Sequence, residues 1–235
     1  MGLPTPTQST QPSSAKRDIG RRLAQVALAV LMPTVALGIG TLMVGHWAPM
    51  PQPDTAPDSL LARGLRSSFF SGDDANDASR ILPPSPESEL NSWRLVHVLY
   101  EDCGCSALVL EHLLERPRSD RAEECLLLVH DNASRSDQEL ISAAGRAGLR
   151  TQSVSQDELA QQFGIQAAPL FVVLDPTGDV RFCGGYTERK RGLAYLDLDV
   201  LTTLQSGRRP SPIPVFGCGV ASTLQDSLDP LGLKY

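Results

Sequence analysis

The sequence has few cysteines and no excess of basic residues. Five cysteines scattered over 235 residues do not make a disulfide scaffold, and their odd number leaves at least one thiol free or paired outside the chain. A net charge of −6 without a basic stripe argues against nucleic acid as the main partner. The length is sufficient for one folded domain with additional segments.

Charge is missing altogether from one long stretch near the N-terminus, which predicts a single transmembrane anchor over residues 23–46. Four basic residues lie between positions 16 and 22, and none follows the stretch until Arg63. The positive-inside rule therefore predicts a cytoplasmic, disordered N-terminal tail over 1–22 and an extracytoplasmic or periplasmic location for the rest of the chain. A cleaved signal peptide is the alternative.

Two further segments show little regular pattern. Residues 47–90 are dominated by Pro, Ser and Asp and are interpreted as a tether, although 59–70 is compatible with a short helix. Residues 208–235 form a C-terminal extension broken by Pro and Gly, whose function is not readable.

The folded domain is expected over residues 91–207. Its apolar patterns predict strands at 93–100, 125–131 and 150–154 and a hairpin at 169–186 with an Asp-Pro-Thr-Gly turn. Helical patterns fall at 105–117, 136–149, 155–164 and 193–207. Strands that alternate with helices and end in a hairpin indicate an α/β fold with a mixed central sheet and flanking helices.

The stretch Glu101-Asp102-Cys103-Gly104-Cys105 places two thiols where the first strand gives way to a helix. The N–H groups and dipole at a helix N-terminus favour a thiolate, which is the reactive form of cysteine. We expect Cys103 to be the more exposed, attacking thiol and Cys105 to resolve the mixed disulfide. The two acidic neighbours should raise the pKa of Cys103, and Gly104 should permit the distorted backbone that a Cys103–Cys105 bond needs.

The order of these elements resembles the thioredoxin-like superfamily, and the most specific match is the run Gly164-Ile165-Gln166-Ala167-Ala168-Pro169 that leads into the hairpin. The insertion at 136–154 and the anchor are similar to membrane-bound, extracytoplasmic thiol–disulfide oxidoreductases of the TlpA/ResA type. The resemblance implies a cis proline at Pro169 that faces the cysteines, and pairing of the Ala168 backbone with an extended substrate. It also implies exchange or isomerisation of protein disulfides without a cofactor.

The cysteine motif departs from that family, whose usual site is Trp-Cys-x-x-Cys. The single spacer residue should give a strained, easily reduced disulfide, so an oxidant or isomerase-like potential is expected. The alternatives are a copper-handling protein similar to the Sco type, for which His130 is the only plausible histidine ligand, and a redox-inactive structural domain.

The sequence predicts a role for one of the three remaining cysteines and leaves the roles of the other two open. Cys125 lies in an expected buried strand and should be inert. Cys183 and Cys218 are candidates for a structural disulfide, but Cys218 is equally well placed as a third redox thiol or as a free thiol. The Gly-Cys-Gly sequence around Cys218 indicates a special backbone requirement there.

Overall fold

A computed structural model describes residues 14–70, 92–131, 137–190, 192 and 194–229 of the protein. The chain divides into two compact units, Met1–Ala48 and Pro49–Tyr235. The first unit is described by helix α1 (Ser14–Trp47), which contains Pro33. One helix of the described residues is long and apolar enough to cross a membrane, and its apolar window, Arg21–Gly38, is not buried within the protein.

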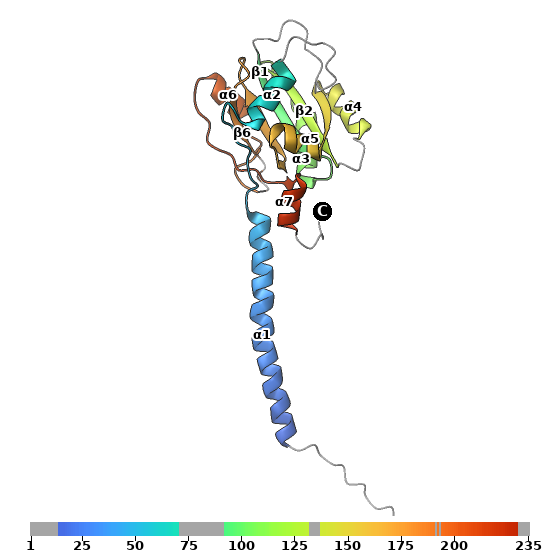
Figure 1. Ribbon diagram of the computed structural model, residues 1–235, viewed down its shortest axis with the longest axis vertical. Helices are drawn as coiled ribbons and strands as arrows, with labels where there is room; N and C mark the ends of the chain where they lie inside the picture. The colour runs from blue at the N-terminus through green and yellow to red at the C-terminus, as the bar shows by residue number, and fades with distance from the viewer. Residues whose placement is uncertain (1–13, 71–91, 132–136, 191, 193, 230–235) are drawn as a thin grey trace, which may run out of the picture. The chain divides into compact units, whose positions relative to one another are not determined.

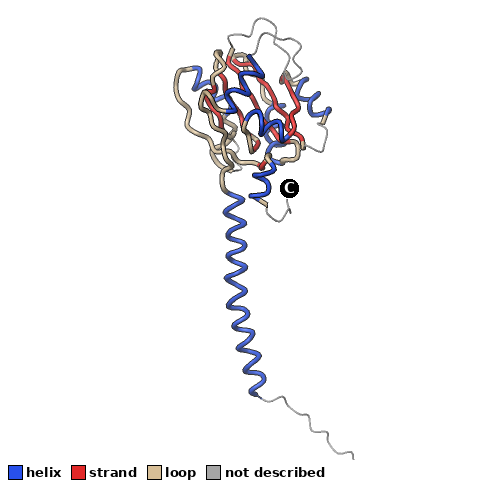
Figure 2. Tube along the Cα trace, viewed as in Figure 1, coloured by secondary structure: helices blue, strands red, loops and turns tan. Residues whose placement is uncertain are grey.

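The second unit is built on a five-stranded mixed sheet with strand order β3-β2-β1-β5-β6 (Figures 1 and 2). The central strand β1 is parallel to β2 and antiparallel to β5, β3 continues the parallel side, and β6 closes the hairpin with β5. The strands are β1 (Trp93–Tyr100), β2 (Ala122–His130), β3 (Arg150–Ser155), β5 (Leu170–Leu174) and β6 (Val180–Gly184). The mixed α/β class expected from the sequence is therefore observed.

Helices cover both faces of this sheet. One face packs against α2 (Leu60–Phe70) and α5 (Gln156–Phe163), and the other against α3 (Gly104–Glu115), α4 (Gln138–Arg146) and α6 (Asp197–Gln205). Alternate residues of β1 point to opposite faces, so Val96 and Val98 join the first core and Leu95 and Leu99 the second. Local signals fix the helix ends: Ser155 and Glu158 form a capping box before α5, and Gly164 ends that helix in the left-handed conformation.

Helix α2 differs from the spacer that the sequence favoured for this region. Leu61 and Leu65 are fully buried in the core beside Phe163 of α5. A Cβ atom at Gly64 would collide with the carbonyl oxygen of Gln162, so the glycine permits the two helices to approach closely. Apolar burial thus holds residues 60–70 on the domain, and the part of the predicted tether at 71–90 lies outside the described residues.

The C-terminal extension is also part of this unit. The short strands β4 (Ala167–Ala168) and β7 (Cys218–Gly219) pair antiparallel, and helix α7 (Ser222–Leu228) follows β7. Ile213, Val215 and Val220 are buried against the domain. The folded structure therefore continues beyond residue 207.

A cluster of charged side chains lies buried under the helical face that carries α3 and α6. Arg116 binds both oxygens of Glu124 at 2.8 and 3.1 Å and reaches Asp197 at 2.8 Å. The ring of His97 lies 2.8 Å from the hydroxyl of Tyr186 and 3.5 Å from Glu124. Burial lowers the pKa of His97, so the ring is neutral.

This cluster makes the stability of the domain depend on acid. Burial opposes ionisation of Glu124, but hydrogen bonds from His97, Arg116 and the Ser119 amide outweigh it and lower its pKa from 4.5 to about 2. Both Glu124 and His97 have lowered pKa values in the folded state, so each binds protons more readily when unfolded. Their stabilising contributions are complete above the unfolded-state pKa values and are lost as the pH falls.

We therefore expect the free energy of unfolding to decrease as the pH is lowered below about 6.5, and to decrease further between about pH 4.5 and pH 2. The share of Glu124 in this loss is about 3 kcal/mol. Urea titrations at pH 8, 6, 4.5 and 3 measure it. Equal midpoints across this series would contradict the assignment of these pKa values.

Candidate active site: a thiol cluster at a helix N-terminus

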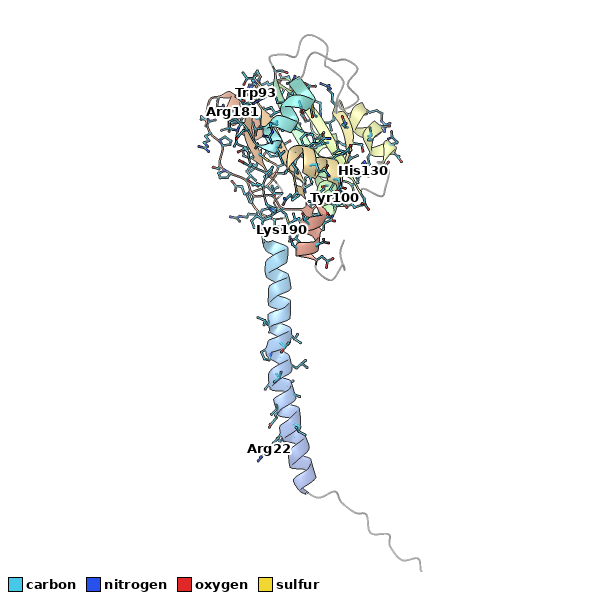
Figure 3. All side chains as sticks on the ribbon, in the orientation of Figure 1. Arg22, Trp93, Tyr100, His130, Arg181 and Lys190 are labelled. Atoms are coloured by element: carbon cyan, nitrogen blue, oxygen red, sulfur yellow. The ribbon has the colours of Figure 1, made fainter. Side chains whose placement is uncertain are left out.

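The cysteine motif lies at the end of β1 where α3 begins. Cys103 is the N-cap residue of α3, in an extended conformation with φ −112° and ψ 115°, and its amide donates to the Tyr100 carbonyl at 3.1 Å. The Ser106 hydroxyl accepts from the Tyr100 amide at 3.0 Å and ties the first turn of the helix to the strand. Figure 3 shows Tyr100 and Trp93 at opposite ends of β1, with Tyr100 at the end that carries the site.

The strand-opening proline faces this helix end, as the resemblance implied. The Ala168–Pro169 peptide bond is cis, and the Ala168 carbonyl oxygen lies 3.9 Å from the Cys103 sulfur. Ala168 and Pro169 immediately precede β5, which pairs with β1, and this pairing positions the proline segment beside the motif. The sequence-predicted site residues Cys103, Ala168 and Pro169 are thus brought together.

A third thiol completes the cluster. The sulfur of Cys218 lies 2.6 Å from the sulfur of Cys103, although 115 residues separate them in the sequence. No disulfide joins any of the five cysteines in the structure. The Cys183–Cys218 bridge that the sequence left open is not formed, and Cys218 contacts Cys103 as the alternative of a third thiol requires.

The expectation that Cys103 is the more exposed thiol is wrong. Cys103 is 1 % exposed, whereas Cys105 is half-buried. Cys103 belongs to the same buried cluster as Ala168, Val215 and Cys218, so the C-terminal extension covers it. The position of Cys103 before the helix favours exposure, but the C-terminal segment packs over it.

The electrostatic surroundings of Cys103 lower its pKa. Hydrogen bonds from the thiols of Cys105 and then Cys218 stabilise its thiolate, burial opposes ionisation, and the backbone amides of Ser106 and Cys105 add to the stabilisation. The carboxylate of Glu101 accepts a hydrogen bond from the Asp137 amide at the start of α4. Neither Glu101 nor Asp102, which were expected to raise the pKa of Cys103, is among the main causes of its shift.

Gly104 does not provide the distortion that the sequence analysis expected of it. It is the first residue of α3 and is not among the glycines with positive φ. Cys103 precedes this helix in an extended conformation, and the Cys105 thiol hydrogen-bonds to its sulfur. The two thiols therefore lie close together without a positive φ at Gly104.

Cys105 is expected to control the acidity of Cys103. Cys105→Ala removes the largest favourable hydrogen bond and should raise the pKa of Cys103, so that alkylation of Cys103 by iodoacetamide needs a higher pH. Cys105→Ser retains a hydroxyl donor and should shift the profile less. The pH dependence of the alkylation rate at Cys103, followed by mass spectrometry, measures both variants. Identical pH profiles for the alanine variant and the unmodified chain would show that this hydrogen bond does not lower the pKa of Cys103.

The other two cysteines are buried residues of the sheet. Cys125 is fully buried in β2, and burial raises the pKa of Cys183 in β6 to about 12. Both are therefore packed residues of the core, and the Cys183 thiol is protonated.

His97, His112 and His130, whose side chains the structure describes, each have partners other than the thiols of the site. His97 points into the opposite core, His112 stacks on Tyr195, and the ring of His130 lies 2.8 Å from the Asp131 carbonyl. Among the described residues no group of three or more His, Cys, Asp or Glu side chains has an arrangement that could hold a metal ion.

Three residues at the site were missed from the sequence. Gly217 packs directly on the Ala168 carbonyl, and the Gly-Cys-Gly pattern around Cys218 was the signal for this close approach. The Tyr100 hydroxyl accepts from Gln156 at 2.9 Å and also interacts with Gln225 of α7. No sequence pattern distinguished Tyr100 or Gln225 from ordinary packing and surface residues.

The sheet order, the cis proline and the thiol at the start of α3 together have the arrangement of a thioredoxin-like domain. No protein-family model matches the chain, and no curated protein matches it.

Similar solved structures are distant. A hypothetical protein from Sinorhizobium meliloti is 16 % identical over 56 % of this chain and 80 % of its own, with a TM-score of 0.47. An uncharacterized conserved protein from Geobacillus kaustophilus is 14 % identical over 56 % of this chain and 77 % of its own, with a TM-score of 0.46. The exposed lipoprotein thioredoxin of Streptococcus pneumoniae is 14 % identical over 50 % of this chain and 87 % of its own, with a TM-score of 0.32. At these values the activity has to be inferred from the site of this chain itself.

Proposed function

We propose that this chain is a membrane-anchored, extracytoplasmic thiol–disulfide exchange protein in which Cys103 is the nucleophile. The observation that carries the proposal is the Cys103 thiol at the N-terminus of α3, between two other thiols and opposite the Ala168 carbonyl and cis Pro169. The apolar stretch of helix α1 and the basic residues at the N-terminal end of the helix support the anchor and the orientation.

The chemistry follows from the lowered pKa of Cys103. Its thiolate attacks one sulfur of a protein disulfide, so that a bond from Cys103 to the substrate forms and the other substrate sulfur leaves as a thiolate. A neighbouring thiol then attacks Cys103 and releases the second substrate sulfur. The substrate gains two electrons and the thiol pair of this chain is oxidised, and the reverse sequence oxidises a substrate dithiol.

Stabilisation of the Cys103 thiolate favours the reduced form of the site. An easily reduced disulfide has a high potential, which supports the role of oxidant or isomerase. We therefore expect the disulfide formed by Cys103 to have a reduction potential above that of thioredoxin, which is roughly −270 mV.

Quantification of thiols in the full chain, extracted from membranes in detergent, tests the proposal. Equilibration in glutathione buffers of graded potential should convert two thiols reversibly to a disulfide that includes Cys103, identified by peptide mapping. A Cys103 thiol that never oxidises would overturn the exchange function. Retention of one copper ion by the reduced chain, without any exchange activity, would favour the copper-handling alternative instead.

A further inference from the structure

The segment from Ile213 to Ala221 runs along the domain as an ordered strap. The Ile213 carbonyl accepts from the Gly185 amide at 3.1 Å and from the Gln52 side chain at 2.7 Å. Met50 donates to the Val215 carbonyl at 2.8 Å. These contacts fix the path of the chain from the edge of β6 toward the thiol cluster.

The strap then occupies the backbone edge beside the cis proline. β7 pairs antiparallel with β4, so that Cys218 lies opposite Ala168 and Gly219 opposite Ala167. The amides of Val220 and Ala221 both donate to the Gln166 carbonyl, at 2.7 and 3.1 Å. This is the edge at which an extended substrate was expected to pair, and the chain fills it with its own residues.

The geometry also presents a cysteine to Cys103 at the position of a bound substrate. Antiparallel pairing with Ala168 aims the Cys218 side chain at Cys103, and the two sulfurs lie 2.6 Å apart. Gly217 allows the close approach, because a Cβ atom there would collide with the Ala168 carbonyl oxygen and lie 2.6 Å from Cδ of Pro169. Cys218 itself is buried.

Helix α7 holds the strap in this register. The Gln225 side chain donates to the Gly219 carbonyl at 3.0 Å and also interacts with Tyr100 beside the site. Leu224 packs against the core cluster that contains Cys103 and Cys218. The strap therefore has a defined docked position on both sides of Cys218.

We propose that Cys218 is the redox partner of Cys103, and that β7 acts as an internal substrate strand that competes with protein substrates for the β4 edge. This proposal rests on the exchange function proposed above. After Cys103 has formed a mixed disulfide with a substrate, the Cys218 thiolate attacks the Cys103 sulfur, a Cys103–Cys218 disulfide forms, and the second substrate sulfur leaves as a thiolate. The substrate disulfide is reduced by two electrons, and the Cys103 and Cys218 thiols are oxidised.

Trapping of mixed disulfides identifies the resolving thiol. The reduced full chain and its Cys105→Ser and Cys218→Ser variants are incubated with insulin, whose disulfides serve as the probe, and are quenched with acid. We expect Cys218→Ser to accumulate at least tenfold more Cys103–insulin mixed disulfide than the unmodified chain, and Cys105→Ser to accumulate several times less than Cys218→Ser. Melting temperatures of the three proteins verify that each is folded.

The outcomes separate this proposal from the exchange function. Accumulation in Cys105→Ser but not in Cys218→Ser would overturn the role of Cys218 and leave exchange by the Cys103–Cys105 pair. Absence of any Cys103 adduct in all three proteins would overturn the exchange function itself.

A variant outside the cysteines tests whether docking of β7 delivers Cys218. Gly217→Ala should displace the strap, lower the yield of the Cys103–Cys218 disulfide at least severalfold and increase the alkylation rate of Cys103. Gly145→Ala in α4 is the matched control, because a Cβ atom there meets open space. Unchanged disulfide yield and alkylation in Gly217→Ala would contradict delivery by β7.

Discussion

Replacement of Cys103 by serine will lower the rate of disulfide exchange by a thousandfold or more. A hydroxyl is not ionised at neutral pH and does not form a mixed disulfide, so the variant lacks the group to which every step is assigned, and losses on the order of a thousandfold or more follow removal of a nucleophile. The thiolate of Cys103 is the one that the surrounding hydrogen bonds stabilise. Reduction of insulin by the full chain with a regenerating reductant measures the rate.

Cys125→Ala is the control for this prediction. Cys125 is buried in β2, and its substitution changes a packed thiol without touching the site. We expect exchange by this variant to stay within about twofold of the unmodified rate at a temperature where it is folded. If Cys103→Ser retained most of the activity, the nucleophile would have to be another thiol, and the half-buried Cys105 would be the next candidate.

The largest decrease in the free energy of unfolding is expected from substitution of Arg116, which takes no part in the thiol chemistry. Its side chain is 8 % exposed, and its guanidinium binds Glu124 and Asp197, whose side chains are each 2 % exposed. Arg116→Met keeps much of the packing but leaves two carboxylates buried without their main cation. Removing one partner of a buried ion pair costs about 3–5 kcal/mol. Urea denaturation at pH 7 measures this loss.

An exposed ion pair provides the comparison. Arg66 and Asp179 lie 2.9 Å apart with side chains that are 44 % and 52 % exposed. Arg66→Gln should change the free energy of unfolding by less than about 1 kcal/mol, because solvent screens such pairs. Equal losses at Arg66 and Arg116 would show that burial does not decide the strength of these interactions here.

Much of the domain was predictable because its elements carry strong local signals. The apolar runs of β1 and β2, the capping residues of α4 and α5 and the turn of the β5–β6 hairpin each act within a few residues. The positions of Cys103 at a helix start and of Pro169 at a strand start follow from those elements. The expected helix over 105–117 corresponds to α3, displaced by one or two residues at its ends.

The missing parts depend on contacts between distant segments. β7 consists of only Cys218 and Gly219, so it has no periodicity from which pairing with β4 could be predicted. The sequence was compatible with a helix at α2, but its burial depends on packing against α5. Arg116, Glu124 and Asp197 come from three elements, and no spacing in the sequence connects them.

The most direct test of the account is the identity of the disulfide that forms when the reduced full chain meets a stoichiometric protein disulfide. Rapid acid quenching, alkylation of the remaining thiols and peptide mapping by mass spectrometry identify it. The account predicts a disulfide between Cys103 and Cys218, with Cys125 and Cys183 still reduced. Oxidation that leaves Cys103 as a free thiol would contradict it.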